Sequence, residues 1–160
     1  ICIREGALEE AAAKLAEADQ QRVRVRGTCE GRPFDDFRDL DDLTSSFFEV
    51  LTSTGKYYWI PTERVDRVEF HAPERPKDLL WRRAHMVVQD GPDGEVFLPS
   101  LYAQTHASQE DQLRLGRGTQ WVEQEHAPVR GIGQRMFLVG DEALPILQLK
   151  EVAFERSSES

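Results

Sequence analysis

Four histidines, His71, His85, His106 and His126, are the side chains in this sequence best suited to bind a transition metal. None of them belongs to an HxH, an HxxxH or a cysteine–histidine pattern with the spacing of metal ligands. Scattered histidines are more often surface residues, or hydrogen-bonded to a neighbouring group, than ligands. A fold can bring them together, but the sequence itself predicts no metal site.

An acidic run offers the clustered carboxylates that Ca²⁺ and Mg²⁺ prefer: Asp35, Asp36, Asp39, Asp41 and Asp42. The run lacks the alternating ligand positions and the glycine turn of an EF-hand loop. A solvated loop is the simpler interpretation. Asp41 or Asp42 is then placed to cap a helix that the spacing of apolar residues predicts over 43–51.

Two glycine-containing segments have only part of a phosphate-binding pattern. Gly131-Ile132-Gly133 lacks the third glycine of a dinucleotide loop and precedes an expected strand, so we predict a bulge or a close backbone approach inside a sheet. Gly116-Arg117-Gly118 lacks the lysine and hydroxyl residue of a P-loop. No serine stands in a GxSxG elbow. The sequence therefore predicts no cofactor-binding residue and no catalytic residue.

Catalytic groups can also be assembled from residues that are distant in sequence. Glu123, Glu125 and His126 would form an acid/base site only with help from elsewhere, and an exposed strand edge is the default. A small-molecule-binding or hydrolytic domain remains the alternative function, with a site drawn from dispersed residues: Arg82, Arg130, Arg135, Asp141 and Glu142. A deep pocket with converging carboxylates or histidines would support it, and a shallow apolar groove would favour a binding protein.

Aromatic residues near arginines form the more informative pattern. Trp81 precedes two arginines, and Tyr57-Tyr58-Trp59 places three aromatic rings in succession. In a strand, Tyr57 and Trp59 share one face while Tyr58 takes the other. Only one face can belong to the core, so the opposite face presents an aromatic ring beneath a helix or at an interface. Aromatic and arginine side chains are enriched at binding hot spots.

Composition limits the class of protein that presents these residues. The 160 residues suit one ordinary domain, and 20 basic against 29 acidic residues give a charge of −9, which disfavours nucleic acid as a partner. Cys2 and Cys29 make a poor disulfide framework, so a reduced, cytoplasmic setting is favoured. No apolar run is long enough to cross a membrane, and no signal peptide is recognisable.

The elements expected to position these residues are one helix and several short strands. Apolar residues at helical spacing predict a helix from Leu8 to about Arg24, interpreted as the last helix of a larger helical region. Asp90-Gly91-Pro92-Asp93-Gly94 predicts a tight hairpin connection between 83–89 and 95–98. Further strands are expected at 34–40, 56–60, 65–70, 119–123, 135–139 and 144–154, with a helical turn at 78–81 and a loop with a short helix at 103–113.

This order of elements predicts an α+β fold, in which a bent antiparallel sheet of short strands has helices on one side. The expected division is a terminal helix of the helical region at 1–26, the α+β domain at 27–156 and a polar tail at 157–160. Residues near the centres of four expected strands are predicted to share one core: Trp59, Phe97, Phe137 and Leu147.

Five segments together resemble the ImpE (TagJ) family of type VI secretion accessory proteins: GKYYWIP at 55–61, DLLWRRA at 78–84, EVFLPSLY at 95–102, RLGR at 114–117 and GIGQRMFLVGDEALPILQL at 131–149. The similarity runs in order from about Gly27 to Phe154. It implies a cytoplasmic, non-enzymatic adaptor that binds the small subunit of the contractile sheath through that subunit's N-terminal helix. It also implies an influence on sheath assembly, or on recycling by the ClpV unfoldase, and a preceding helical-repeat half of tetratricopeptide type.

Recognition of an amphipathic helix requires an apolar channel with a polar rim and no reactive centre. The residues expected to border such a surface are large and apolar, and they stand where strands end or loops begin: Tyr58, Trp81, Leu101 and Tyr102.

Overall fold

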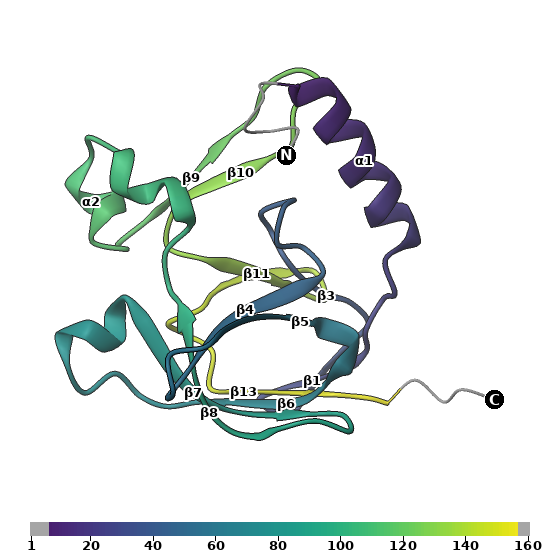
Figure 1. Ribbon diagram of the computed structural model, residues 1–160, viewed down its shortest axis with the longest axis vertical. Helices are drawn as coiled ribbons and strands as arrows, with labels where there is room; N and C mark the ends of the chain where they lie inside the picture. The colour runs from purple at the N-terminus through teal and green to yellow at the C-terminus, as the bar shows by residue number, and fades with distance from the viewer. Residues whose placement is uncertain (1–6, 157–160) are drawn as a thin grey trace.

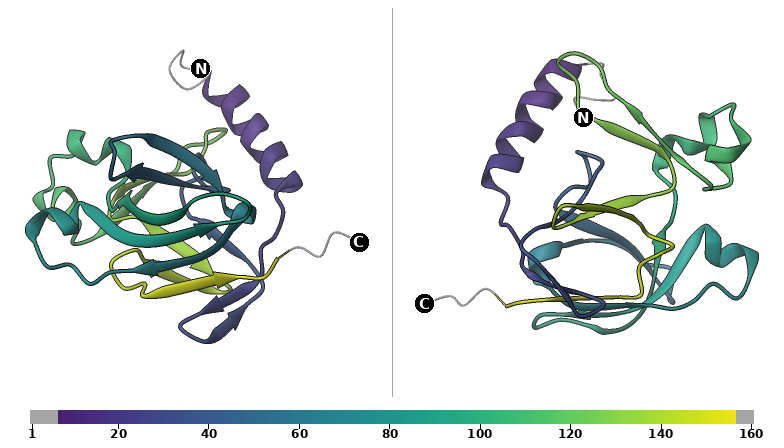
Figure 2. Two further views of the ribbon diagram at one scale, coloured as in Figure 1. Left: turned by 60° about the horizontal axis from the view of Figure 1, so that its bottom comes forward. Right: turned by 180° about the vertical axis from the view of Figure 1, so that it is seen from behind.

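An eight-stranded antiparallel sheet forms the larger part of the structure, a computed structural model that describes residues 7–156 (Figure 1). Its strands, in spatial order, are β2 (Arg32–Phe34), β1 (Gly27–Cys29), β13 (Glu151–Phe154), β6 (Val65–Phe70), β7 (Trp81–Val88), β8 (Asp93–Pro99), β4 (Phe47–Thr52) and β5 (Tyr57–Pro61). The sheet bends over, so that the ribbon of β4 and β5 lies opposite β13 and β6 (Figures 1 and 2).

Two smaller sheets complete the strand structure. One has three antiparallel strands in the order β12 (Glu142–Pro145), β11 (Met136–Val139) and β3 (Phe37–Asp39), and the other is a ribbon of β9 (Thr119–Val122) and β10 (Arg130–Gly133). Segments distant in sequence meet in the first of these, because β3 pairs with β11. This pairing brings the acidic run beside the C-terminal third of the chain.

Helices are few in the described residues and do not form one layer. α1 (Leu8–Gln21) and α2 (Asp111–Arg114) lie on different sides of the molecule, and the 3₁₀ turns are η1 (Thr62–Arg64), η2 (Pro76–Leu79) and η3 (Ala103–Ala107) (Figure 1). The expected α+β class with an antiparallel sheet is present, but the expectation of helices covering one side is wrong. Strands cover the sheet's inner face instead, and Ala11 is the one buried residue of α1.

The hairpin predicted around Asp90–Gly94 is confirmed. β7 and β8 pair from Trp81↔Pro99 to Val87↔Asp93, and the Val88 N–H donates to the Pro92 carbonyl across 3.0 Å at the turn. Asp90 has a positive φ of 51°, a conformation that aspartate tolerates better than most residues. Local turn chemistry was therefore sufficient to specify this part of the sheet.

The helix expected over 43–51 is wrong, because residues 47–52 form strand β4. Phe48 and Val50 are buried while Phe47 and Glu49 are less so, which is the period of two of a strand. Aromatic and β-branched residues lie on both faces of this strand, so their spacing also matches the period of a helix by chance. Pairing with β5, from Phe47↔Pro61 to Leu51↔Tyr57, decides the outcome.

The last strand expected over 144–154 is instead two strands in different sheets. β12 ends at Pro145, and β13 begins at Glu151. The Gln148 N–H donates to the Pro145 carbonyl, closing a turn that buries Ile146 and Leu149 completely or nearly so.

Strand β1 was not expected from the sequence. A Cβ on Gly27 would lie 2.0 Å from the Ala153 carbonyl oxygen, so only glycine permits this close pairing of β1 with β13.

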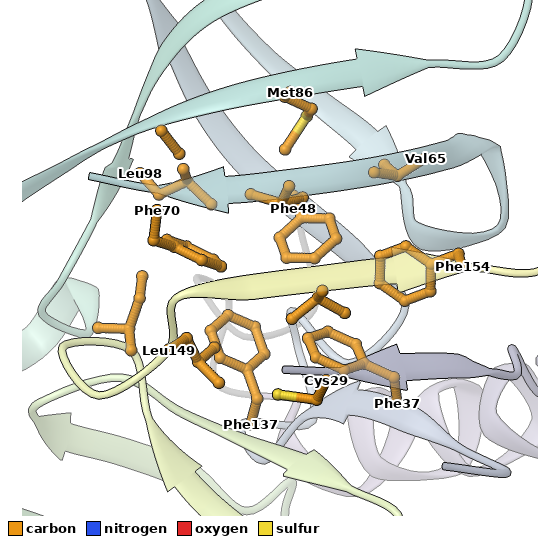
Figure 3. Close-up of a cluster of buried hydrophobic side chains, with 14 of the residues drawn as sticks. Cys29, Phe37, Phe48, Val65, Phe70, Met86, Leu98, Phe137, Leu149 and Phe154 are labelled. Carbon is orange, nitrogen blue, oxygen red and sulfur yellow. The ribbon is translucent and has the colours of Figure 1, made fainter. Parts of the chain in front are cut away.

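The core lies between the bent sheet and the three-stranded sheet, and phenylalanine dominates it (Figure 3). Phe37 is central, with ring centroids 5.1 Å from Phe137 and 5.2 Å from Phe154. The prediction that Trp59 belongs to this core is wrong, because its side chain is 62% exposed. Phe137 is buried and Leu147 packs against the cluster as expected, whereas Phe97 is half-buried.

Candidate functional site

β5 is an edge strand, and its position explains why three aromatic rings remain exposed. It pairs with β4 on one side and is the last strand in the sheet order. The turn before it reverses at Gly55, whose φ of +81° favours glycine, and the Thr52 N–H donates to the Lys56 carbonyl. Tyr57, Tyr58 and Trp59 are about half to two-thirds exposed, which is uncommon for adjacent aromatic residues.

The outer face of the β4–β5 ribbon carries an ordered aromatic strip, consisting of Phe47, Tyr57 and Trp59. The Trp59 ring stacks on Phe47 with centroids 4.6 Å apart, and its Nε1–H donates to the Tyr57 hydroxyl across 2.7 Å. The Tyr57 hydroxyl in turn donates to Glu49 Oε1. These contacts hold the exposed rings in one arrangement, so the strip is rigid before any partner binds.

A buried ion-pair network lies beneath this strip. Arg135 binds Glu49 Oε2 through Nη2, and it donates from Nη1 to Asp39 Oδ2 across 2.6 Å. The Tyr102 hydroxyl donates to Asp39 Oδ1 across 2.8 Å, and the Arg135 guanidinium lies 5.1 Å from the centre of the Tyr102 ring. A hydrogen-bonded path therefore links the exposed Trp59 to the interior of the molecule.

Burial and charge set the protonation of this network. Burial alone would lower the pKa of Arg135, but the charges of Asp39 and Glu49 outweigh it and raise that pKa. Burial and the charge of Asp39 raise the pKa of Tyr102, so the phenol keeps the proton that it donates. Burial also raises the pKa of Asp39, against the opposing charge of Arg135. Such arrangements hold a geometry in place and resemble a structural clamp more than a reactive centre.

The acidic run is not the solvated loop that its composition suggested. Asp39 and Asp41 are almost fully buried, and Asp41 accepts hydrogen bonds from Arg130 Nε and from the N–H of Gly131. Asp41 also accepts from the Leu43 N–H, but no helix follows for it to cap. Burial of Asp39 and Asp41 is tolerated because arginines distant in sequence supply the compensating charge.

Gly131 and Gly133 bear out the expected close backbone approach within a sheet. A Cβ on Gly131 would lie 2.2 Å from the Tyr102 ring, and Gly133 has a φ of +96°. Both glycines are in β10, with Gly131 opposite Trp121 of β9. The Tyr102 ring can therefore lie directly on the backbone and reach Asp39 with its hydroxyl.

An apolar hollow of about 510 Å³ opens on the inner face of the same ribbon. β4 pairs with β8 only at Leu51↔Phe97 and Thr52↔Val96, which leaves the space unfilled between the ribbon and the β7–β8 hairpin. The residues that line it are mostly apolar, with two cations and one carboxylate among them, and they include Val50, Tyr58, Trp59, Ile60, Met86, Val88, Val96, Lys56, Arg64 and Glu95. Edge strand β5 thus presents an aromatic strip outward and an apolar hollow inward.

The four residues predicted to border a binding surface do not meet in one place. Tyr58 lines the apolar hollow, whereas Leu101 and Tyr102 line a separate hollow of about 350 Å³. Tyr102 is only 3% exposed, so its ring serves the interior rather than a partner. Trp81 lines neither hollow; it is 40% exposed and continues an apolar patch from Leu80. The structure therefore brings together only Leu101 and Tyr102.

The three arginines of the alternative, dispersed site are engaged elsewhere. Arg82 donates to the carbonyls of Leu147 and Leu149, and Arg130 and Arg135 are paired with buried aspartates. Glu142 is exposed and lies 3.8 Å from Arg32. Asp141 is exposed and lines a hollow of about 760 Å³ that none of the other four residues lines, so the five groups do not converge on one pocket.

The histidines stay apart from any metal-binding arrangement in the described part of the chain. His71 and His85 contact the carboxylates of Glu95 and Asp93, and His106 contacts the Ala103 carbonyl. Within residues 7–156, no three histidine, cysteine or acidic side chains are grouped as metal ligands would be. Cys29 is buried with a free thiol, and Cys2 lies outside the described residues. No helix in residues 7–156 has the length and hydropathy needed to cross a bilayer.

Sequence reasoning missed the pairing of Asp39 with Arg135 and of Asp41 with Arg130. Each pair joins residues about 90 positions apart, so no local spacing could reveal it. The one available signal was composition. Charged residues stand beside apolar ones at 38–42 and at 130–135, and charged residues are unusual in short strands that pack on a core.

Known proteins resemble this chain in both sequence and fold. The profile of the ImpE protein family matches residues 31–153. The type VI secretion system accessory component TagJ of Pseudomonas aeruginosa is 31% identical over 151 residues, covering 94% of this chain and 52% of TagJ. The chain thus spans about half the length of this curated relative. The crystal structure of protein VPA1032 from Vibrio parahaemolyticus has the same fold, with a TM-score of 0.90 and 23% identity over 98% of this chain and 58% of that one. With more than half of its residues matched by the family profile, this chain belongs to the ImpE family.

Proposed function

We propose that this protein is a type VI secretion accessory protein that acts by binding, and not by catalysis. The 31% identity to TagJ, over nearly the whole of this chain, is the observation that carries the proposal. The bound partner is the small subunit of the contractile sheath, recognised through its N-terminal helix. Through this contact the protein influences sheath assembly, or recycling by the ClpV unfoldase, in the cytoplasm.

The arrangement of polar groups supports a binding role. The arginines that a dispersed catalytic site would need are held by buried aspartates or by backbone carbonyls. Such charges stabilise a fold and are not free to bind a substrate or to transfer protons. Surfaces suited to binding are present among the described residues, including the aromatic strip of Phe47, Tyr57 and Trp59 and the apolar hollow behind it.

Helix recognition by a groove suits these features. A partner helix buries one apolar face, and rigid aromatic anchors lose little conformational entropy on binding. The net charge of −9 supports a protein partner over nucleic acid.

Calorimetric titration tests the proposal directly. A peptide that copies the N-terminal helix of the small sheath subunit is titrated into the protein, and a scrambled peptide of the same composition is the control. We expect saturable binding of the first peptide only. Absence of heat with both peptides, together with failure of the intact sheath subunit to co-purify, would overturn the proposal. Turnover of a small molecule by the purified protein would favour the hydrolytic alternative.

A further inference from the structure

We propose that the apolar hollow behind β5 is the binding site for the partner, and that it selects a segment with a large apolar side chain flanked on both sides by carboxylates. This inference rests on the proposed function, because it assigns that partner a place and a chemistry. Trp59 of the aromatic strip also lines this hollow, whereas Phe47 and Tyr57 lie outside it.

The shape of the hollow sets the apolar part of the ligand. Val50 and Met86, which are at most 1% exposed, and Val96 form its floor. Tyr58 and Ile60 of β5 form one wall. The volume of about 510 Å³ exceeds that of any single side chain, so one large residue and part of its neighbours can enter.

The charges around the hollow set the polar part. Lys56 stands directly before β5, and Arg64 ends the 3₁₀ turn that follows it, so the two cations flank the wall formed by β5. Both are exposed, and neither forms an ion pair within residues 7–156, where most other arginines are paired. The carboxylate of Glu95, which also lies at the hollow, is directed to the opposite face of β8, where it accepts from His71.

Lys56 and Arg64 thus place two exposed cations beside an apolar hollow in a chain of charge −9. They attract the carboxylates of a partner to the hollow, which raises the association rate and fixes the register of binding. Their separation along β5 favours a peptide segment, with one carboxylate for each cation, over a small amphiphile with a single acidic head.

Charge reversal at the rim tests the site. We expect the double variant Lys56→Glu, Arg64→Glu to bind the sheath-subunit peptide about tenfold or more weakly than the wild type. The same peptide with its Asp and Glu residues changed to Asn and Gln should lose a similar factor toward the wild type. It should show no further loss toward the double variant. Arg117→Glu, at an exposed arginine away from the hollow, is the matched control and should leave affinity within about twofold.

The outcomes distinguish failure of this site from failure of the proposed function. Equal affinity of the wild type and the double variant for the peptide would overturn this site and leave the proposed function standing. Lack of binding by the wild type to the peptide and to the intact sheath subunit would overturn both. Saturable binding of dodecanoate at the hollow, with no displacement by the peptide, would overturn the peptide ligand in favour of a small amphiphile. Tyr58→Ala supplies an independent check, since weaker binding with an unchanged salt dependence is expected from loss of an apolar wall.

Discussion

Arg135 and Asp39 form a buried ion pair in which Nη1 lies 2.6 Å from Oδ2, and both side chains are at most 4% exposed. The pair joins β3 to the residue immediately before β11, and Arg135 extends the contact to Glu49 beneath the aromatic strip. Arg135 thus connects the buried pair to Glu49, the side chain that accepts the hydrogen bond of the exposed Tyr57.

Replacement of Arg135 by Met should destabilise the protein by about 3–5 kcal/mol, because the substitution leaves Asp39 buried without its counter-charge. Urea unfolding at neutral pH measures the loss. Adding Asp39→Asn to the variant should recover part of the stability, since the uncompensated charge disappears. A loss below about 1 kcal/mol for Arg135→Met would show that the pair contributes little.

Gly131→Ala should destabilise the protein by about 1–3 kcal/mol, because the new Cβ would lie 2.2 Å from the Tyr102 ring and force it from its position. Displacement also strains the hydrogen bond from Tyr102 to Asp39. Thermal unfolding of Gly131→Ala is compared with that of Gly94→Ala, where no atom lies within 4 Å of the added Cβ. Similar melting temperatures for the two variants would contradict the expectation.

The ion pair between Arg22 and Asp36 should make stability depend on acid pH. Burial alone would raise the pKa of Asp36, but the hydrogen bonds and charge of Arg22 outweigh it, so the pKa lies below its usual value. The carboxylate therefore contributes stability above its unfolded pKa of about 4, and this contribution is lost as pH falls through the lower folded pKa.

Asp36→Asn is the matching variant for that pH dependence. It should be less stable than the wild type at neutral pH by about 1 kcal/mol, since the pair is only partly buried. Chemical unfolding at a series of pH values should show the two proteins converging below the folded pKa of Asp36. A constant difference down to strongly acid pH would mean that the effect of the substitution is not electrostatic.

Trp59→Ala should change the free energy of unfolding by less than about 1 kcal/mol, because the ring is 62% exposed. Phe137→Ala is the contrast and should cost about 3–5 kcal/mol, since that ring packs on Phe37 in the core. Differential scanning calorimetry of both variants measures the difference. A large loss for Trp59→Ala would indicate that the aromatic strip contributes to the fold and is not mainly a surface feature.

The sequence by itself determined those parts of the protein in which the signal is local. Turn residues at Asp90–Gly94 specified the hairpin, apolar spacing specified α1, and alternation indicated β6. These patterns involve residues a few positions apart, where backbone preferences and side-chain direction act without help from the rest of the chain. The family resemblance rests likewise on short segments, and the family profile confirms it.

Tertiary structure decided the rest, because it depends on which distant segments meet. Residues 47–52 fitted a helical spacing, yet pairing with β5 makes them a strand, and the edge position of β5 leaves Trp59 outside the core. Asp39 reads as a solvated residue until Arg135, 96 positions later, offers the charge that makes its burial tolerable. The free energy of burying a charge is set by its partner in space, and no local pattern of residues contains that information.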